Sequence, residues 1–226
     1  MPGREIPLVS GEFYHVLNRG TAAQPIFFNK RDYQHALETL FYNQNILLPT
    51  KFSKFLTFSI TKKEELLTNL KNRKKIWCEI NSFCLMPNHF HLLLQQKEKN
   101  GISKFIGNFT NSYTKYFNTK RERAGSIFQG KFKAIRIETD EQLLHVSRYI
   151  HLNPFSSFVV KSLKDLEKYP YSSLKEYLGN NKSSFCGKKI ILEQFDNNLE
   201  LYKKFVFDQA DYQRSLEVVK HLSLED

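Results

Sequence analysis

Residues 86–94, Met-Pro-Asn-His-Phe-His-Leu-Leu-Leu, constrain the fold most, because they place two histidines inside a long apolar run. Side chains along a β-strand alternate between its faces, so His89 and His91 share one face and Phe90 takes the other. Two adjacent imidazoles on a rigid strand form half of a metal site. The pattern predicts a buried strand over residues 79–95, with a bulge or a sheet edge at Pro87, which cannot donate a ladder hydrogen bond.

The alternative is that both histidines are simply hydrogen-bonded within a packed sheet. Their flanks are apolar on both sides, where an unpaired imidazole is costly and a ligand role is not. The local context therefore favours metal binding.

Composition narrows the class of protein further. The chain has 226 residues, 41% of them hydrophobic, with a formal net charge of +11 and a pI of about 9.4. Such a charge favours a polyanionic partner, either nucleic acid or an anionic membrane surface. No apolar run approaches the ~20 residues that span a bilayer, and residues 1–5 do not resemble a secretion signal. Three cysteines without a CxxC pair indicate reduced packing residues of a cytoplasmic protein.

The order of expected elements indicates an α+β fold, with helices covering an antiparallel sheet. Asn29 is expected to cap the first helix, capping boxes at residues 61–64 and 139–142 to open two more, and Pro154 to end the last. The remaining patterns predict a strand over residues 13–18, a helix over 101–118, a turn and strand within 124–138, and an ambiguous segment, read as a short strand, over 51–60. A short helix ending at Gly179, a linker over 180–187 and one or two final helices are expected to follow.

The helix over residues 140–153 carries the second half of the predicted site. His145, Tyr149 and Asn153 recur at steps of four and so lie on one helical face. This face is either a solvated polar surface or a catalytic one, in which Asn153 gives the metal a neutral oxygen and Tyr149 supplies an attacking oxygen. His15, on the first strand, and His145 are candidates to support the metal ligands from outside, although a hydrogen-bonded strand histidine is the more common state of a residue such as His15.

Two other helical tyrosines compete for the role of nucleophile. Four residues after Tyr113 and Tyr116 stand Phe117 and Lys120, neither of which is a usual ligand of divalent metals. This difference favours Tyr149.

A basic segment follows the helix over residues 101–118. Residues 125–131 mimic a phosphate-binding loop, but Phe132 stands where that motif needs Ser or Thr, and a strand follows instead of a helix. We interpret the segment as a basic loop for the DNA backbone, with a solvated turn as the alternative. The expected contacts are Lys120, Arg121, Arg123, Lys131, Lys133 and Arg136.

Five segments together resemble the single-tyrosine HUH transposases, most closely the REP-associated tyrosine transposases. His89-Phe90-His91 resembles the histidine-hydrophobic-histidine motif, and residues 149–154 resemble the nucleophile helix. Residues 14–20, 125–132 and 169–173 are similar to further family segments, in the family's order. The resemblance spans residues 13 to 180. It predicts a catalytic domain over residues 1–180 and a helical C-terminal extension over 181–226.

The resemblance implies a ferredoxin-like sandwich with the histidines on a central strand. It also implies single-stranded DNA, often beside a hairpin, as substrate, with Mg²⁺ or Mn²⁺ and a covalent 5′-phosphotyrosine. By position, Tyr149 is the nucleophile, and His89, His91 and Asn153 hold the metal. The insertion-sequence branch commonly has glutamine as third ligand, so Asn153 places the chain nearer the REP-associated branch. The alternatives are a domesticated hairpin-processing or replication-initiating nuclease, and a nucleic-acid-binding module without catalysis. A homodimer is compatible with each.

Overall fold

The computed structural model describes residues 7–73, 75–179 and 185–222, and its strands in these ranges form one antiparallel sheet in the order β2-β3-β1-β4. The strands are β1 (Phe13–Arg19), β2 (Cys78–Met86), β3 (His89–Gln96) and β4 (Lys133–Ile137). The main helices between them are α1 (Lys30–Asn43), before β2, and α4 (Gly101–Lys120), after β3. The fold is therefore α+β and ferredoxin-like, as predicted, with β3 in the interior of the sheet.

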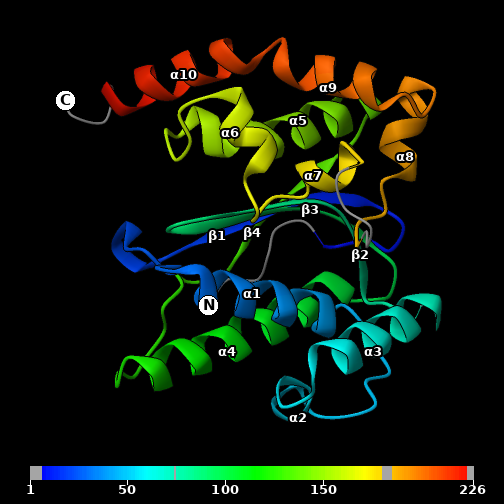
Figure 1. Cartoon of the computed structure of the whole chain (residues 1–226), viewed down its shortest axis with the longest axis vertical. Helices are drawn as coiled ribbons and strands as arrows, with labels where there is room; N and C mark the ends of the chain where they lie inside the picture. Colours follow the sequence, from blue (N-terminus) through cyan, green and yellow to red (C-terminus); the bar gives the residue numbers. More distant parts are fainter. Residues whose placement is uncertain (1–6, 74, 180–184, 223–226) are drawn as a thin grey trace.

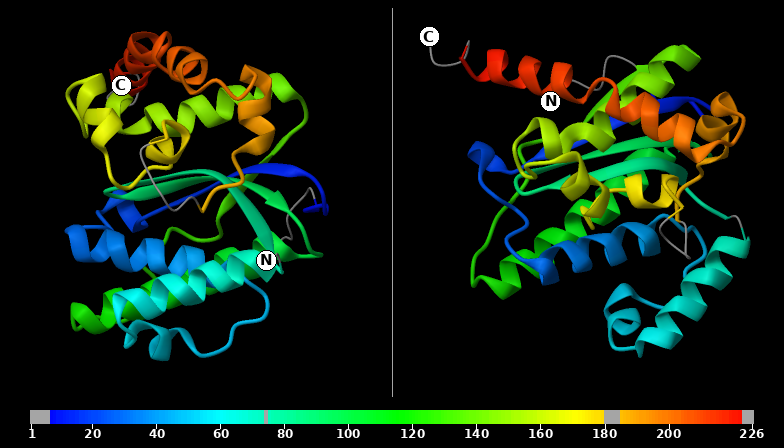
Figure 2. Two further views of the ribbon diagram at one scale, coloured as in Figure 1. Left: turned by 45° about the vertical axis from the view of Figure 1, so that its right-hand side comes forward. Right: turned by 45° about the horizontal axis from the view of Figure 1, so that its top comes forward.

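The sheet lies between two helical layers (Figure 1). Helices α1 and α4 cover one face, and α5 (Asp140–Ser156) covers the other, which we call the α5 side. The two rotated views show the same three layers (Figure 2). The remaining helices are α2 (Phe52–Leu56), α3 (Ile60–Arg73), α6 (Leu163–Lys168), α7 (Leu174–Tyr177), α8 (Lys189–Leu192), α9 (Leu199–Phe207) and α10 (Ala210–Leu222), with 3₁₀ turns at Thr21–Ala23 and Glu193–Phe195.

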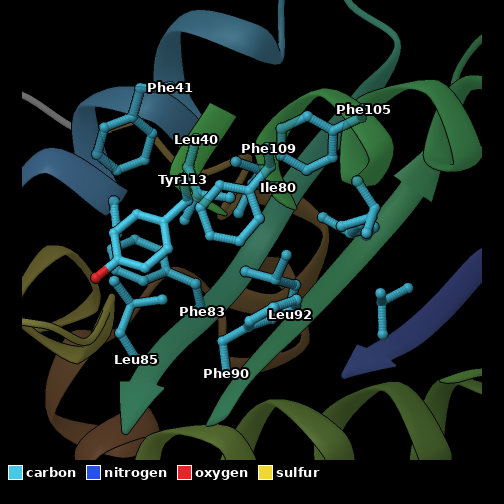
Figure 3. Packing of buried hydrophobic residues seen from close by; sticks show 14 of the residues in the cluster. Leu40, Phe41, Ile80, Phe83, Leu85, Phe90, Leu92, Phe105, Phe109 and Tyr113 are labelled. Carbon is cyan, nitrogen blue, oxygen red and sulfur yellow. The ribbon is translucent and has the colours of Figure 1, made fainter. Parts of the chain in front are cut away.

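Strand alternation divides the core into two parts. Phe90 and Leu92 point toward α1 and α4, where they pack with Phe105 and Phe109 of α4 (Figure 3). Leu93 points to the α5 side and joins a second apolar cluster. His89 and His91 alternate with Phe90 and Leu92 along β3 and therefore face α5, as Leu93 does.

The histidine segment is a hairpin, so the prediction of one strand over residues 79–95 was wrong. Strands β2 and β3 pair antiparallel, with Met86 opposite His89 and Pro87-Asn88 at the turn. Pro87 needs no ladder partner at this position, and its carbonyl accepts hydrogen bonds from the backbone N–H groups of Ile26 and Phe27, at 2.8 and 2.9 Å. The turn thus anchors His89 at the first position of β3.

Three further local predictions needed correction. The ambiguous segment over residues 51–60 contains the helix α2, not a strand. Helix α3 begins at Ile60, before the predicted capping box, and Ser59 Oγ accepts from the backbone N–H of Lys62 at 3.3 Å. Helix α5 continues past Pro154 to Ser156, because the Ser157 N–H still bonds the Asn153 carbonyl at 3.0 Å.

Other helix signals were confirmed. The Asn29 and Thr139 side chains cap α1 and α5 by accepting from the N–H groups of Asp32 and Gln142, each at 3.2 Å. These caps fix where α1 and α5 begin.

The last two helices, α9 and α10, pack on the α5 side. Tyr202 of α9 lies in the same apolar cluster as Ile150 of α5, and α10 also packs along α5. The boundary predicted at residue 180 and most of the 180–187 linker lie outside the described residues, so the division into two domains stays a prediction. In the described part of the chain no helix combines the length and apolarity needed to cross a membrane.

Candidate active site

Two histidines from neighbouring strands and one tyrosine from α5 meet on the α5 side of the sheet. His15 of β1 and His91 of β3 are buried, and the His15 Nε2 and His91 Nδ1 atoms lie 2.9 Å apart. The Tyr149 ring stands edge-on to both, with centroids 5.4 Å from His91 and 5.8 Å from His15. The structure thus places the phenol of Tyr149 beside the imidazoles of His91 and His15, although β1, β3 and α5 are far apart in sequence.

His89, the other histidine of the predicted metal site, lies beside His91. Its ring centroid is 4.9 Å from that of His91, with the ring planes nearly perpendicular. Its Nδ1 atom lies 2.6 Å from Asn88 Oδ1, which can only accept, so Nδ1 carries the proton. In both histidines Nδ1 is engaged by a neighbour, which orients the ring.

Asn153 lies one helical turn after Tyr149 and is buried. Its Oδ1 accepts from Ser157 Oγ at 3.4 Å, while its Nδ2 has no hydrogen-bond partner among the described residues. Rotating the amide by half a turn places the oxygen at the unsatisfied position and turns the NH₂ toward Ser157, whose hydroxyl can also accept. The site therefore offers a buried amide whose oxygen can serve as a third ligand.

The Tyr149 hydroxyl is held in its protonated form. Burial raises the pKa of the phenol, and the adjacent Asn153 amide, in the orientation that it has in the structure, lowers it only in part. Glu217 and Cys84 raise the pKa further. Any reaction in which this oxygen attacks must therefore remove its proton and stabilise the phenolate.

Helix α10 lies along α5 at the level of the tyrosine. Gln213 Nε2 donates to the Tyr149 carbonyl at 3.2 Å and to Ser156 Oγ at 3.3 Å. The C-terminal helix thus helps to fix the backbone that carries Tyr149.

His145, the other residue on the predicted face, is exposed. Its contacts within the described chain are with Arg148, at 3.4 Å, and with the Phe205 ring, at a centroid distance of 6.5 Å. The structure does not bring it to the paired imidazoles.

The predicted DNA contacts have several different environments. Lys120 and Arg121 form ion pairs with the buried Asp32, at 2.6 and 3.0 Å. Arg136 pairs with Glu12 at 3.1 Å. The Arg123 guanidinium lies 5.6 Å from the centre of the Phe117 ring. The two remaining cations, Lys131 and Lys133, are exposed. Lys120 and Arg121 therefore stabilise the fold, and the contribution of the whole set to DNA binding stays a prediction.

Sequence reasoning missed a buried polar network around His151 of α5. His151 Nδ1 lies 2.7 Å from the Tyr202 hydroxyl, and His151 Nε2 lies 2.7 Å from Ser173 Oγ. Ser147 Oγ also bonds Tyr202, at 2.7 Å. A histidine within the apolar stripe of α5 was the available signal, but its partners lie 22 and 51 residues away.

Within the described residues, no group of three or more His, Cys, Asp and Glu side chains is arranged to hold a metal ion. The predicted ligand set contains two histidines and an asparagine, so this finding does not address it.

Comparison with known proteins agrees with the resemblance found in the sequence. Residues 43–153 match the family described as "Transposase IS200 like", a range that contains His89, His91, Tyr149 and Asn153. The resemblance to the IS200-like, single-tyrosine transposases is thereby confirmed.

Two individual proteins are similar to this chain. A relative from Haemophilus influenzae, named as an inferred REP-associated tyrosine transposase, is 32% identical over 105 residues, which cover 42% of this chain and 58% of that protein. The solved structure of a REP-associated tyrosine transposase bound to a REP hairpin shares the fold, with a TM-score of 0.51 and 15% identity over 82% of this chain and 89% of the other. The chain thus matches little more than half of the curated relative.

Proposed function

We propose that this chain is a transposase-like enzyme that cleaves and rejoins single-stranded DNA beside hairpins, with Tyr149 as its nucleophile. The observation that carries the proposal is the position of the Tyr149 ring, 5.4 Å from His91 by ring centroids and beside Asn153. Similarity to IS200-like transposases over residues 43–153 supports the same chemistry.

The reaction is a transesterification. The Tyr149 oxygen forms a bond to phosphorus, the bond from phosphorus to the 3′-oxygen breaks, and the products are a 5′-phosphotyrosine and a 3′-hydroxyl. The phenol loses its proton and the departing 3′-oxygen gains one. A later 3′-hydroxyl reverses the step without ATP, because the phosphotyrosine keeps the energy of the phosphodiester bond.

His89, His91 and Asn153 fit a divalent cation such as Mg²⁺ or Mn²⁺. The fit rests on the Nδ1 contacts of the two histidines and on the unsatisfied amide atom of Asn153. When bound, the cation polarises the scissile phosphate. His15 positions His91, and burial lowers the pKa of His15 to about 4, so its neutral ring can accept from His91 Nδ1.

The proposed partner is single-stranded DNA with a hairpin. The net charge of +11 and the solved relative of similar fold, which holds a REP hairpin, support this choice. Three buried cysteines that form no disulfide are compatible with action in the reducing cytoplasm. A homodimer is also compatible with the proposal.

The test is covalent capture of a hairpin oligonucleotide with a single-stranded flank. A label at the 3′ end marks the downstream fragment, which is the one that a 5′-phosphotyrosine retains. Wild type with Mn²⁺ should give a labelled adduct on a denaturing gel, whereas chelation of the metal and Tyr149→Phe should each abolish it. Phenylalanine retains the ring that packs on His15 and His91.

Tyr212→Phe is the matched control, since Tyr212 is 63% exposed on α10. This variant should form the adduct as wild type does. An adduct that persists in Tyr149→Phe would assign the nucleophile elsewhere. Hairpin binding without any adduct, unchanged by His89→Ala, would instead indicate a binding module without catalysis.

A further inference from the structure

A hollow of about 590 Å³ lies between α1, α2 and α4 and has no part in the proposed reaction. Helices α1 and α4 cover the sheet face opposite α5, so the hollow and Tyr149 lie on opposite sides of the sheet (Figures 1 and 2). Its volume falls within the usual range for small-ligand sites, roughly 300–1,000 Å³. The lining residues that matter here are Arg31 and His35 of α1, Phe52 of α2 with the preceding Lys51, and Lys115 and Tyr116 of α4.

Aromatic rings form part of the wall. The His35 ring stacks on Tyr116, with centroids 3.8 Å apart and planes inclined by 14°, and Phe52 meets His35 edge-on at 5.6 Å. Burial, with a contribution from Arg31, lowers the pKa of His35 to about 4, so its ring is neutral at pH 7. All three half-buried rings can contact a flat, uncharged ligand.

Cations surround these rings. Arg31, Lys51 and Lys115 are exposed and form no ion pair with any described residue. No aspartate or glutamate lines the hollow. Three unneutralised positive charges beside an apolar recess give a potential that attracts anions.

We propose that this hollow binds single-stranded DNA, with one unpaired base packed against the aromatic wall and the flanking phosphates on Arg31, Lys51 and Lys115. Aromatic rings inside a positively charged groove are the combination by which proteins hold single strands, because every base has a stacking face and every nucleotide a phosphate. The identity of the ligand as DNA rests on the proposed function. The hollow would hold the strand at a distance from the phosphodiester that reacts.

Binding of the labelled hairpin with its single-stranded flank tests the charges first. The rim variant replaces Arg31, Lys51 and Lys115 by alanine. Its control replaces three exposed lysines of the opposite layer, Lys161, Lys164 and Lys204. A phosphate contact on single strands contributes about 0.7 to the slope of log affinity against log salt, so the rim variant should lose about 2 from this slope. An equal loss in the control would overturn the site, because it would show general attraction only.

A fluorescent base analogue placed along the flank tests the base pocket. Its emission should be quenched at one position on binding to wild type and to Phe52→Tyr. In Phe52→Leu the quenching should disappear and affinity should fall roughly ten-fold, because leucine fills space but does not stack. Quenching that is the same in Phe52→Leu and wild type would refute the base pocket. Equally strong quenching with a free mononucleotide would also refute it, since the ligand would then not be a strand.

Covalent capture separates this inference from the proposed function. At saturating protein, the rim variant should still form the Tyr149 adduct, because its substitutions lie across the sheet from the tyrosine. Adduct formation with unchanged binding in the rim variant and in Phe52→Leu would refute the hollow alone. If these variants weaken binding but wild type forms no adduct, the proposed cleavage by Tyr149 alone is refuted.

Discussion

Replacement of His151 by glutamine should make the stability of the protein less sensitive to acid. His151 lies on α5 between Tyr149 and Asn153 and is fully buried. Burial lowers its pKa from 6.5 to about 3. Its two nitrogens contact the Tyr202 hydroxyl and Ser173 Oγ, a pair of neighbours that a neutral imidazole satisfies with one donor and one acceptor.

The direction of this pH dependence follows from the pKa values of His151 in the unfolded and the folded chain. Between pH 6.5 and 3 the unfolded chain protonates this histidine and the folded chain does not, so falling pH favours unfolding. The contribution of neutral, buried His151 to the free energy of unfolding is fully present above pH 6.5. It is lost at about 1.4 kcal/mol per pH unit below that value, which amounts to about 2 kcal/mol between pH 7 and pH 5.

Urea unfolding at pH 7 and pH 5 measures the effect. Wild type should lose about 2 kcal/mol more of its unfolding free energy over this interval than His151→Gln, since glutamine does not titrate. The variant should be less stable at pH 7, because its amide fills the site less well. His145→Gln, at an exposed position of the same helix, should follow wild type. If His151→Gln and wild type lose the same free energy, the inference that His151 is buried and neutral is wrong.

Three further substitutions test how α4 and α1 are held. A Cβ on Gly101 would collide with the Trp77 carbonyl, so Gly101→Ala should destabilise the protein by about 2 kcal/mol in thermal unfolding. A Cβ on Gly107 would meet open space, so Gly107→Ala should stabilise the protein by up to about 1 kcal/mol. Asp32→Asn should cost about 2 kcal/mol, because it leaves two cations beside a fully buried position, and a variant as stable as wild type would contradict this role. Burial raises the pKa of Asp32, but its hydrogen bonds, above all the one from Lys120, lower the pKa to about 2. The contribution of Asp32 to stability should therefore fade only as pH falls below about 4.

Local patterns in the sequence predicted most of the elements. Helix caps at Asn29 and Thr139 depend on a side chain and a backbone group three residues apart, and both were found as expected. The same information failed at residues 79–95, because an apolar run in strand geometry does not reveal where Pro87 turns the chain. It also failed at α2, whose five residues are stabilised by packing among Tyr42, Phe55 and Leu70.

The sequence by itself determined the chemistry that is available and the faces on which it lies. Alternation along β3 places His89 and His91 on one side, and a step of four along α5 aligns Tyr149 with Asn153, because both periods are properties of the backbone. Only the tertiary structure decided which groups meet. The hydrogen bond between His15 and His91 joins residues 76 positions apart, and it forms because β1 and β3 pair in a register that no local pattern sets.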